Sequence, residues 1–322
     1  MKINFSKGIS FMILLALCLM LANAIYVRTF YHNEVVEADA KLLFDLDSLE
    51  KINDVLYFGE SSTVTYSPDD TCIKTINELI QQQAPGIRLG LIDHGAYHAK
   101  CYLELIKNIK PDSRVKTIIV TMNLRTFGAL WINNSQEASL QKAIVMYLKY
   151  PPIVKRMMLA LSCFDNRTAD ERVPLIQDHW KYDKINVPGN FKYQNTFDWD
   201  QGHGAAGLDT FPDGKWNLQK LGLACNYIKT FGFSIGPNTN PRVNDFDELV
   251  KVAKEKKLNL IFNLMPENVQ YADSLGGKEL GNLMRDNRNF LMKRYNKDGV
   301  IVVDNLELVD GKNFIEQDGN NE

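Results

Sequence analysis

The sequence is poor in the features that mark several protein classes. Its 322 residues include 5 cysteines and no Cys-x-x-Cys pair, so neither a disulfide framework nor a zinc site is indicated, and we expect single buried thiols. No basic stripe accompanies the net charge of -2, so nothing points to nucleic acid. Histidine occurs 5 times and not after His203. The sequence therefore predicts no metal, no cofactor and no nucleic-acid partner.

The composition is that of a globular protein. Hydrophobic residues make up 45% and charged residues 24%, which is enough apolar material to bury a sizeable core. The length suits one large α/β domain, or one such domain that carries an insertion. No internal repeat is present.

The N-terminus carries the strongest local signal. Residues 1–8 contain Lys2 and Lys7 and are assigned to the cytoplasm, and an apolar run follows at residues 9–27. As a helix this run is roughly 28 Å long, close to the thickness of a bilayer core. It is either an uncleaved transmembrane anchor or a signal peptide with a cleavage site at Ala22-Asn23-Ala24. The length favours the anchor. Both interpretations place the domain outside the cytoplasm: it is periplasmic or at the cell surface if anchored, and secreted if the N-terminus is cleaved.

An alternation of strands and helices follows a charged, amphipathic segment at residues 28–52, which we interpret as a helical stalk. Strands alternating with helices predict a three-layer, doubly wound α/β fold with a five-stranded parallel sheet. The expected strands are 54–58, 87–92, 115–122, 258–265 and 300–303, and the expected helices include 71–82, 96–109, 245–256 and 278–295.

The expected domain is interrupted. Residues 53–130 form its first part, 131–244 an insertion and 245–322 its second part. The insertion begins with helices at 138–150 and 153–163 and then becomes rich in loops, at 186–190, 197–204 and 211–216. Such a stretch is typical of a lid or a binding insertion. Its aromatic residues suit either a sugar site or a small satellite core: Trp180, Tyr182, Phe191, Tyr193, Phe197, Trp199, Phe211 and Trp216.

Polar residues follow the first three expected strands. These segments are Gly59-Glu60-Ser61-Ser62, Asp93-His94-Gly95 and Asn123-Leu124-Arg125. Because ligands of parallel sheets bind at the carboxyl ends of the strands, we expect these loops to meet in one site. A serine in a tight turn, a glycine N–H and an asparagine amide are the groups of an acyl-transfer site with an oxyanion hole. A serine of ordinary pKa still needs a base.

These segments resemble the SGNH/GDSL hydrolase family. The strand that ends in Gly59-Glu60-Ser61 resembles the family's first block, with glutamate in place of aspartate. The resemblance implies that Ser61 is the nucleophile and that Ser61, Gly95 and Asn123 form the oxyanion hole. It also implies a flavodoxin-like fold and no cofactor. It covers residues 53–125 and 257–313, and the usual Gly-x-Asn-Asp is replaced around Asn123.

The C-terminus departs from the family pattern. The family supplies its base from an Asp-x-x-His block soon after the last strand, where this sequence has Asp304 but no histidine. We therefore expect a shortened tail and an incomplete triad. His94 is a candidate replacement base, while His98 is expected to be exposed and His203 is a more distant candidate.

Each site residue also has a plainer interpretation. Ser61 could cap a helix, with Ser62 as the fallback nucleophile, and Gly95 and Asn123 could be turn residues. Arg125 could bind a carboxylate or phosphate of the substrate, or form a surface ion pair.

Two functions remain from different classes. The first is a serine esterase or acyl-transfer enzyme of the cell envelope that acts on O-acyl groups of a glycan or lipid, as the resemblance implies. The alternative is a catalytically dead, membrane-anchored binding protein with an SGNH-like fold. A purely structural envelope protein is a third possibility.

Overall fold

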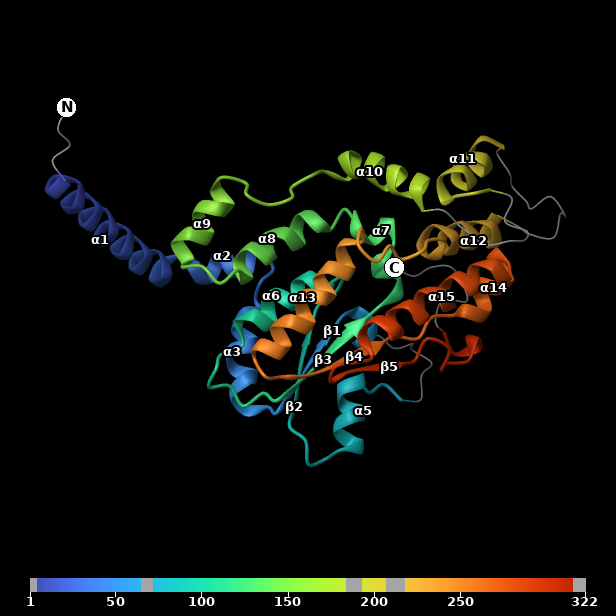
Figure 1. Cartoon of the computed structure of the whole chain (residues 1–322), viewed down its shortest axis with the longest axis horizontal. Coiled ribbons are helices and arrows are strands. Elements are labelled where there is room, and N and C mark those ends of the chain that lie inside the picture. The colour runs from blue at the N-terminus through green and yellow to red at the C-terminus, as the bar shows by residue number, and fades with distance from the viewer. Residues whose placement is uncertain (1–4, 65–71, 184–192, 207–217, 315–322) are drawn as a thin grey trace.

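A computed structural model describes residues 5–64, 72–183, 193–206 and 218–314, without the side chains of residues 5–6, 203–206 and 218–222. The chain begins with helix α1 (Phe5–Thr29), which projects from the rest of the molecule in Figure 1. Its segment Lys7–Thr29 is long and apolar enough to cross a membrane, and none of its most apolar stretch is buried in the protein. The expected apolar N-terminal helix is therefore present.

The expected parallel sheet is confirmed. Its five strands are all parallel and follow the order β2-β1-β3-β4-β5, which places β1 and β3 in the interior. Each strand is rich in apolar residues, as is typical of parallel sheets that are covered on both faces. The bounds are β1 (Val55–Gly59), β2 (Leu89–Asp93), β3 (Thr117–Met122), β4 (Asn259–Leu264) and β5 (Val300–Asp304).

Helices cover the sheet unequally. Figure 1 shows α5 on the opposite side of the strands from α13 and α15. The helix α6 contacts β3, α13 contacts β4 and also packs along α6, and α15 contacts β5, whereas α5 contacts β2. The bounds are α5 (Ile76–Gln83), α6 (Ala99–Asn108), α13 (Pro241–Glu255) and α15 (Lys278–Tyr295), with α14 (Val269–Gly276) before the last of these.

One face of the sheet carries a row of apolar side chains in register. Leu91, Tyr57, Ile119, Ile261 and Ile301 face their neighbours across the five strands. At the β5 end, Ile301 is 54% exposed, whereas the alternate residues of β5 are buried under α15. The edge strand β5 therefore exposes the apolar side chains of Ile301 and Val303 on this face.

We expect this row to bind a dye that fluoresces on apolar surfaces. The double variant Ile301→Thr and Val303→Thr should lower that fluorescence, while the exposed apolar surface of α1 continues to bind dye. It should change the free energy of unfolding by under about 1 kcal/mol, because both side chains are exposed. The matched variant Val302→Thr should destabilise the protein, since Val302 is buried. Equal fluorescence of the double variant and the parent would show that the dye reports another surface.

The segment expected as a stalk belongs to the body of the domain. It forms α2 (Tyr31–Glu37) and α3 (Leu42–Ile52), and Val35, Ala40 and Leu46 lie in the main hydrophobic core. The carboxylate of Glu50 is also buried and accepts a hydrogen bond from the N–H of Lys110. These helices therefore attach α1 firmly to the sheet.

The insertion is more helical than its sequence predicts. After α7 (Ala129–Ile132) come α8 (Glu137–Tyr147), α9 (Pro152–Ala160), α10 (Ala169–Tyr182), α11 (Thr196–Ala206) and α12 (Leu218–Phe231). The expectation of a loop at 197–204 is wrong, because these residues lie in α11. The other two expected loops, 186–190 and 211–216, lie outside the described residues.

Tertiary contacts explain the helix α11 despite its glycines. Each interior glycine costs a helix about 1 kcal/mol relative to alanine. Here Asn195 accepts a hydrogen bond from the N–H of Asp198, Trp199 is buried, and Asp200 forms an ion pair of 2.6 Å with Lys229 of α12. Trp180 and Trp199 are therefore packing residues, and Trp199 belongs to the main hydrophobic core rather than to a separate satellite core.

The expectation of buried cysteines holds only at one position. Cys101 is buried in α6 and Cys225 is partly buried, but Cys18, Cys72 and Cys163 are exposed. Cys18 lies on the unpacked surface of α1, and the other two lie in segments between helices, where the core offers no place for them. Burial raises the pKa of the Cys101 thiol to about 12, which makes it unreactive.

A buried charged cluster joins α6, α8 and α13. The Nε2 of His98 lies 2.8 Å from an oxygen of Glu137, and the same oxygen lies 2.6 Å from the guanidinium of Arg242. His98, Glu137 and Arg242 are all buried, so the expectation of an exposed His98 is wrong. Its position at the N-terminus of α6 places it beneath α8, where its Nδ1 accepts a hydrogen bond from the N–H of Lys100. We refer to these three residues as the buried triad.

Candidate functional site

The loops after the first three strands lie at one edge of the sheet. The interior strand β1 pairs with β2 on one side and β3 on the other, and its last residue, Gly59, is opposite Asp93. Ser61 therefore follows β1 between the loop that contains Gly95 and the loop that begins at Asn123. This is the carboxyl edge, where parallel sheets bind their ligands.

The turn that carries Ser61 is tight for a structural reason. The side chain of Thr63 lies against Gly59, where an added Cβ would meet it at 2.6 Å, so that only glycine fits. The hydroxyl of Thr63 accepts a hydrogen bond from the N–H of Glu60, and the hydroxyl of Tyr102 donates to the carbonyl of Gly59. This packing leaves Ser61 exposed at the first residue of the short helix α4 (Ser61–Val64).

Glu60 organises the polar groups around this turn. It is buried, and its Oε1 accepts hydrogen bonds from the amide of Asn123 at 2.6 Å and from the hydroxyl of Ser62 at 2.9 Å. The side-chain oxygen of Asn123 accepts from the N–H and the Nε of Arg125. The amide that the oxyanion-hole prediction assigns to Asn123 thus donates to Glu60 in this state.

The second loop is held by a different partner. The ring of His94 has its Nε2 2.7 Å from a carboxylate oxygen of Asp39 and its Nδ1 2.7 Å from the carbonyl of Gly95. Ala96 follows with a φ of 62°, a left-handed conformation that is costly for a side-chain-bearing residue. Both nitrogens of His94 are engaged within the domain, so a role as base for Ser61 would require the ring to leave these partners.

The remaining histidines have other surroundings. His98 belongs to the buried triad, and the ring of His32 packs on Phe44. His179 of α10 lies 3.6 Å from Asp183, the residue that follows the helix. His203 lies in α11, and its side chain is outside the described part of the chain.

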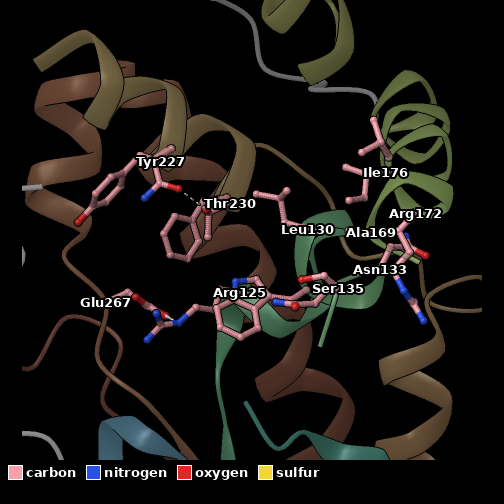
Figure 2. Close-up of a pocket in the computed structure, with 15 residues that line it drawn as sticks. Arg125, Leu130, Asn133, Ser135, Ala169, Arg172, Ile176, Tyr227, Thr230 and Glu267 are labelled. Carbon is pink, nitrogen blue, oxygen red and sulfur yellow. Dashed lines mark hydrogen bonds and ion pairs between the residues drawn. The ribbon is translucent and has the colours of Figure 1, made fainter. Parts of the chain in front are cut away.

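A cavity of about 440 Å³ is lined by Arg125 and by residues of the insertion (Figure 2). It lies between the 3-10 helix η1 (Leu124–Phe127), α7, α10 and α12, and its walls combine charged and aromatic side chains. Of the predicted site residues, Arg125 lines this cavity, and Ser61, Gly95 and Asn123 are not among its described lining residues.

No protein-family model matches the chain, and no curated protein matches it.

Arg125 connects the turn of Glu60 and Ser61, through Asn123, to the cavity. Its Nε lies 3.2 Å from the side-chain oxygen of Asn123 and 3.8 Å from a carboxylate oxygen of Glu267, and its guanidinium lies over the ring of Trp131 at 5.5 Å. Figure 2 shows Arg125 and Glu267 directed toward each other at one end of the cavity. The surface ion pair that the sequence allows for Arg125 is therefore present, partly buried and with Glu267 as its partner.

A second arginine lines the opposite wall. Arg172 of α10 is almost fully buried, lies 3.2 Å from a carboxylate oxygen of Asp165 and donates to the carbonyl of Arg167. Within the described residues, no group of three or more His, Cys, Asp or Glu side chains is arranged to hold a metal ion. The cavity thus offers cationic and aromatic groups for a polar ligand.

Sequence reasoning missed Glu60 and Glu267 as parts of this arrangement. Glu267 follows β4 by three residues, so the same rule that selected the loops after β1, β2 and β3 could have found it. The role of Glu60 depends on the direction of its side chain within a tight turn, which the sequence does not specify.

Proposed function

We propose that this protein is an SGNH-like acyl-transfer or ester hydrolase of the cell envelope, with Ser61 as its nucleophile. The observation that carries the proposal is the exposed Ser61 in a tight turn after the interior strand β1, between the loops of Gly95 and Asn123. The strand order β2-β1-β3-β4-β5, with helices on both sides, supports the doubly wound, three-layer arrangement of that family.

In this proposal the substrate is an O-acylated glycan or lipid. The Ser61 oxygen would attack the acyl carbonyl, the carbon–oxygen bond of the ester would break, and the alcohol would leave with the proton taken from Ser61. The N–H groups of Ser61 and Gly95, with the Asn123 amide once it leaves Glu60, would stabilise the oxyanion. Arg125 would bind the polar part of the substrate from the neighbouring cavity.

A second function is a binding protein that has the same fold but does not turn over its ligand. Two observations favour it: the amide of Asn123 donates to Glu60, and both ring nitrogens of His94 are engaged by Asp39 and Gly95. A serine without a base has little nucleophilic activation.

Turnover of p-nitrophenyl acetate in the presence and absence of imidazole separates the two functions. A positioned base contributes about 10²–10⁴-fold to such reactions. If Ser61 is a nucleophile that lacks its base, imidazole should increase the rate of the parent protein well beyond its effect on Ser61→Ala. The control Ser274→Ala, which removes an exposed hydroxyl far along the chain, should respond like the parent.

Two other results would contradict the assignment of Ser61 as a nucleophile that lacks its base. Equal rates for the parent, Ser61→Ala and Ser274→Ala at every imidazole concentration would remove the nucleophile assignment and leave the binding function. Imidazole-independent turnover that both Ser61→Ala and His94→Ala abolish, with the fold intact, would instead identify His94 as the base.

We further propose that α1 remains as a membrane anchor and that the domain lies outside the cytoplasm. Lys2 and Lys7 precede the apolar run, which suits a cytoplasmic N-terminus. In intact cells, external protease should therefore digest a tag at the C-terminus and spare one at the N-terminus. Equal protection of both tags would contradict this orientation.

A further inference from the structure

The end of α1 is packed against the folded domain. The side-chain oxygen of Asn23 accepts a hydrogen bond of 3.0 Å from the N–H of Ile153 in the first turn of α9. Tyr26, one turn further, is buried and donates to Glu34 of α2. Figure 1 shows α9 beside the C-terminal end of α1, and the two helices are in contact.

This contact sets the depth of α9 relative to a membrane that α1 would cross. The apolar run ends at Val27, four residues after Asn23, which corresponds to about 6 Å along a helix. A bilayer core needs about 20 apolar residues, so nearly the whole run is required to span it. In a membrane that α1 crosses, the first turn of α9 would therefore lie at the boundary between the acyl chains and the headgroups.

The surface of α9 has the residues that such a boundary favours. Met157 is 51% exposed, and Leu161, the residue that follows the helix, is 72% exposed. Tyr150, which precedes the helix, is exposed as well. Phe30, at the end of α1, adds another exposed aromatic ring. Apolar side chains that enter a leaflet, with aromatic rings at headgroup level, are typical of interfacial helices.

The helix is also held rigidly. Lys155 of α9 is buried, and its Nζ lies 2.7 Å from the carbonyl of Met146 in α8 and 3.3 Å from the hydroxyl of Tyr31 in α2. Burial lowers the pKa of Lys155 to about 8. Arg156 lies on the exposed side of the helix, 3.1 Å from Glu34. The exposed apolar residues are thus fixed relative to α1.

We propose that α9 is an interfacial helix that inserts Met157 and Leu161 into the phospholipid leaflet from which α1 emerges. The inference rests on the proposed anchor and goes beyond it, because it adds a second contact with the bilayer and a fixed orientation of the domain. The site at the carboxyl edge of the sheet would then be held at a constant position above the membrane rather than swinging on a single helix.

Fluorescence quenching in phosphatidylcholine vesicles tests this contact. The full chain, with Cys18, Cys72, Cys163 and Cys225 replaced by serine, would carry one labelled cysteine at Leu161→Cys, Leu17→Cys or Leu308→Cys. Leu17 lies in α1 and reports the anchor, and Leu308 is 75% exposed after β5 and reports the aqueous side. A label at Leu161→Cys should have blue-shifted emission, quenching by doxyl lipids and loss of quenching by iodide, as at Leu17→Cys.

Every other outcome contradicts the proposal, and each does so in a different way. Quenching by lipid at Leu17→Cys together with quenching by iodide at Leu161→Cys would leave the anchor and remove the interfacial helix. Quenching by iodide at both positions would remove the anchor as well. Protection of Leu161→Cys from both quenchers would show that protein, such as a second copy of the chain, covers this surface. A label at Met157→Cys repeats the measurement one turn earlier.

Discussion

Replacing Arg242 with methionine is expected to lower the free energy of unfolding by about 3–5 kcal/mol, because the change leaves the Glu137 carboxylate buried without its counter-charge. Arg242 and Glu137 are each almost fully buried and lie 2.6 Å apart. Glu137 is the first residue of α8, and Arg242 lies in the first turn of α13. Loss of this ion pair would therefore weaken the contact between the insertion and the helix that covers the sheet. Urea unfolding of the parent and the variant in detergent measures the difference.

A pair on the surface provides the matched control. Arg294 and Asp247 form an ion pair between α15 and α13 in which both side chains are partly exposed. Because water screens such pairs, Asp247→Asn should cost under about 1 kcal/mol. The double variant Glu137→Met and Arg242→Met should recover much of the stability lost in Arg242→Met, since it removes both charges. A loss in Arg242→Met no greater than in Asp247→Asn would show that water reaches the triad.

Acid should destabilise the protein through the same triad. Burial, with the charge of Arg242 beside it, lowers the pKa of His98 from 6.5 to about 4. Its Nδ1 accepts from the N–H of Lys100 and its Nε2 faces Glu137, so the neutral ring satisfies both contacts. Burial works to raise the pKa of Glu137, but the contacts with His98 and Arg242 outweigh it and lower that pKa to about 2.

The direction of this pH effect follows from the difference in proton binding between the folded and the unfolded chain. The unfolded chain binds a proton on His98 at higher pH than the folded chain does, so this contribution is complete above pH 6.5 and is lost as the pH falls toward 4. The loss is on the order of 3 kcal/mol, from about 1.4 kcal/mol per unit of pKa. Glu137 adds a further loss below pH 4.5. The urea midpoint should therefore decline steadily from pH 6.5 to pH 4.

A variant without a titrating ring isolates the contribution of His98. His98→Gln retains a donor for Glu137 at similar reach and does not change charge in this range. It should be less stable than the parent at pH 7, because it loses the bond from Lys100, yet its stability should depend less on pH between 6.5 and 4. Identical pH dependence in the parent and His98→Gln would show that other groups cause the acid loss.

The sheet was predictable from sequence, and the insertion was predictable only in part. Continuous runs such as residues 115–122, bounded by turn residues, identify buried parallel strands because the pattern needs no information from elsewhere in the chain. Helix α11 could not be predicted in this way, since its stability depends on Trp199 and on the distant Lys229. Glycine-rich sequence favours a loop until such contacts are known.

Prediction of the site from the sequence has the same limit. The rule that loops meet at the carboxyl edge placed Ser61, Gly95 and Asn123 in neighbouring loops. It could not show that the amide of Asn123 donates to Glu60, or that Asp39 reaches His94 from the segment before the sheet. Side-chain direction and contacts between distant segments decide these features, and periodicity contains neither.

The pairing of β3 with β4 has a consequence for how fast the domain forms. More than 130 residues separate Met122 from Asn259, yet these strands lie side by side in the sheet. Closing so long a loop costs little extra stability, because the entropy grows only with the logarithm of its length. It does slow folding, since contacts distant in sequence form late. During synthesis, which proceeds from the N-terminus, β1, β2 and β3 would therefore form an incomplete sheet until the insertion and β4 had followed.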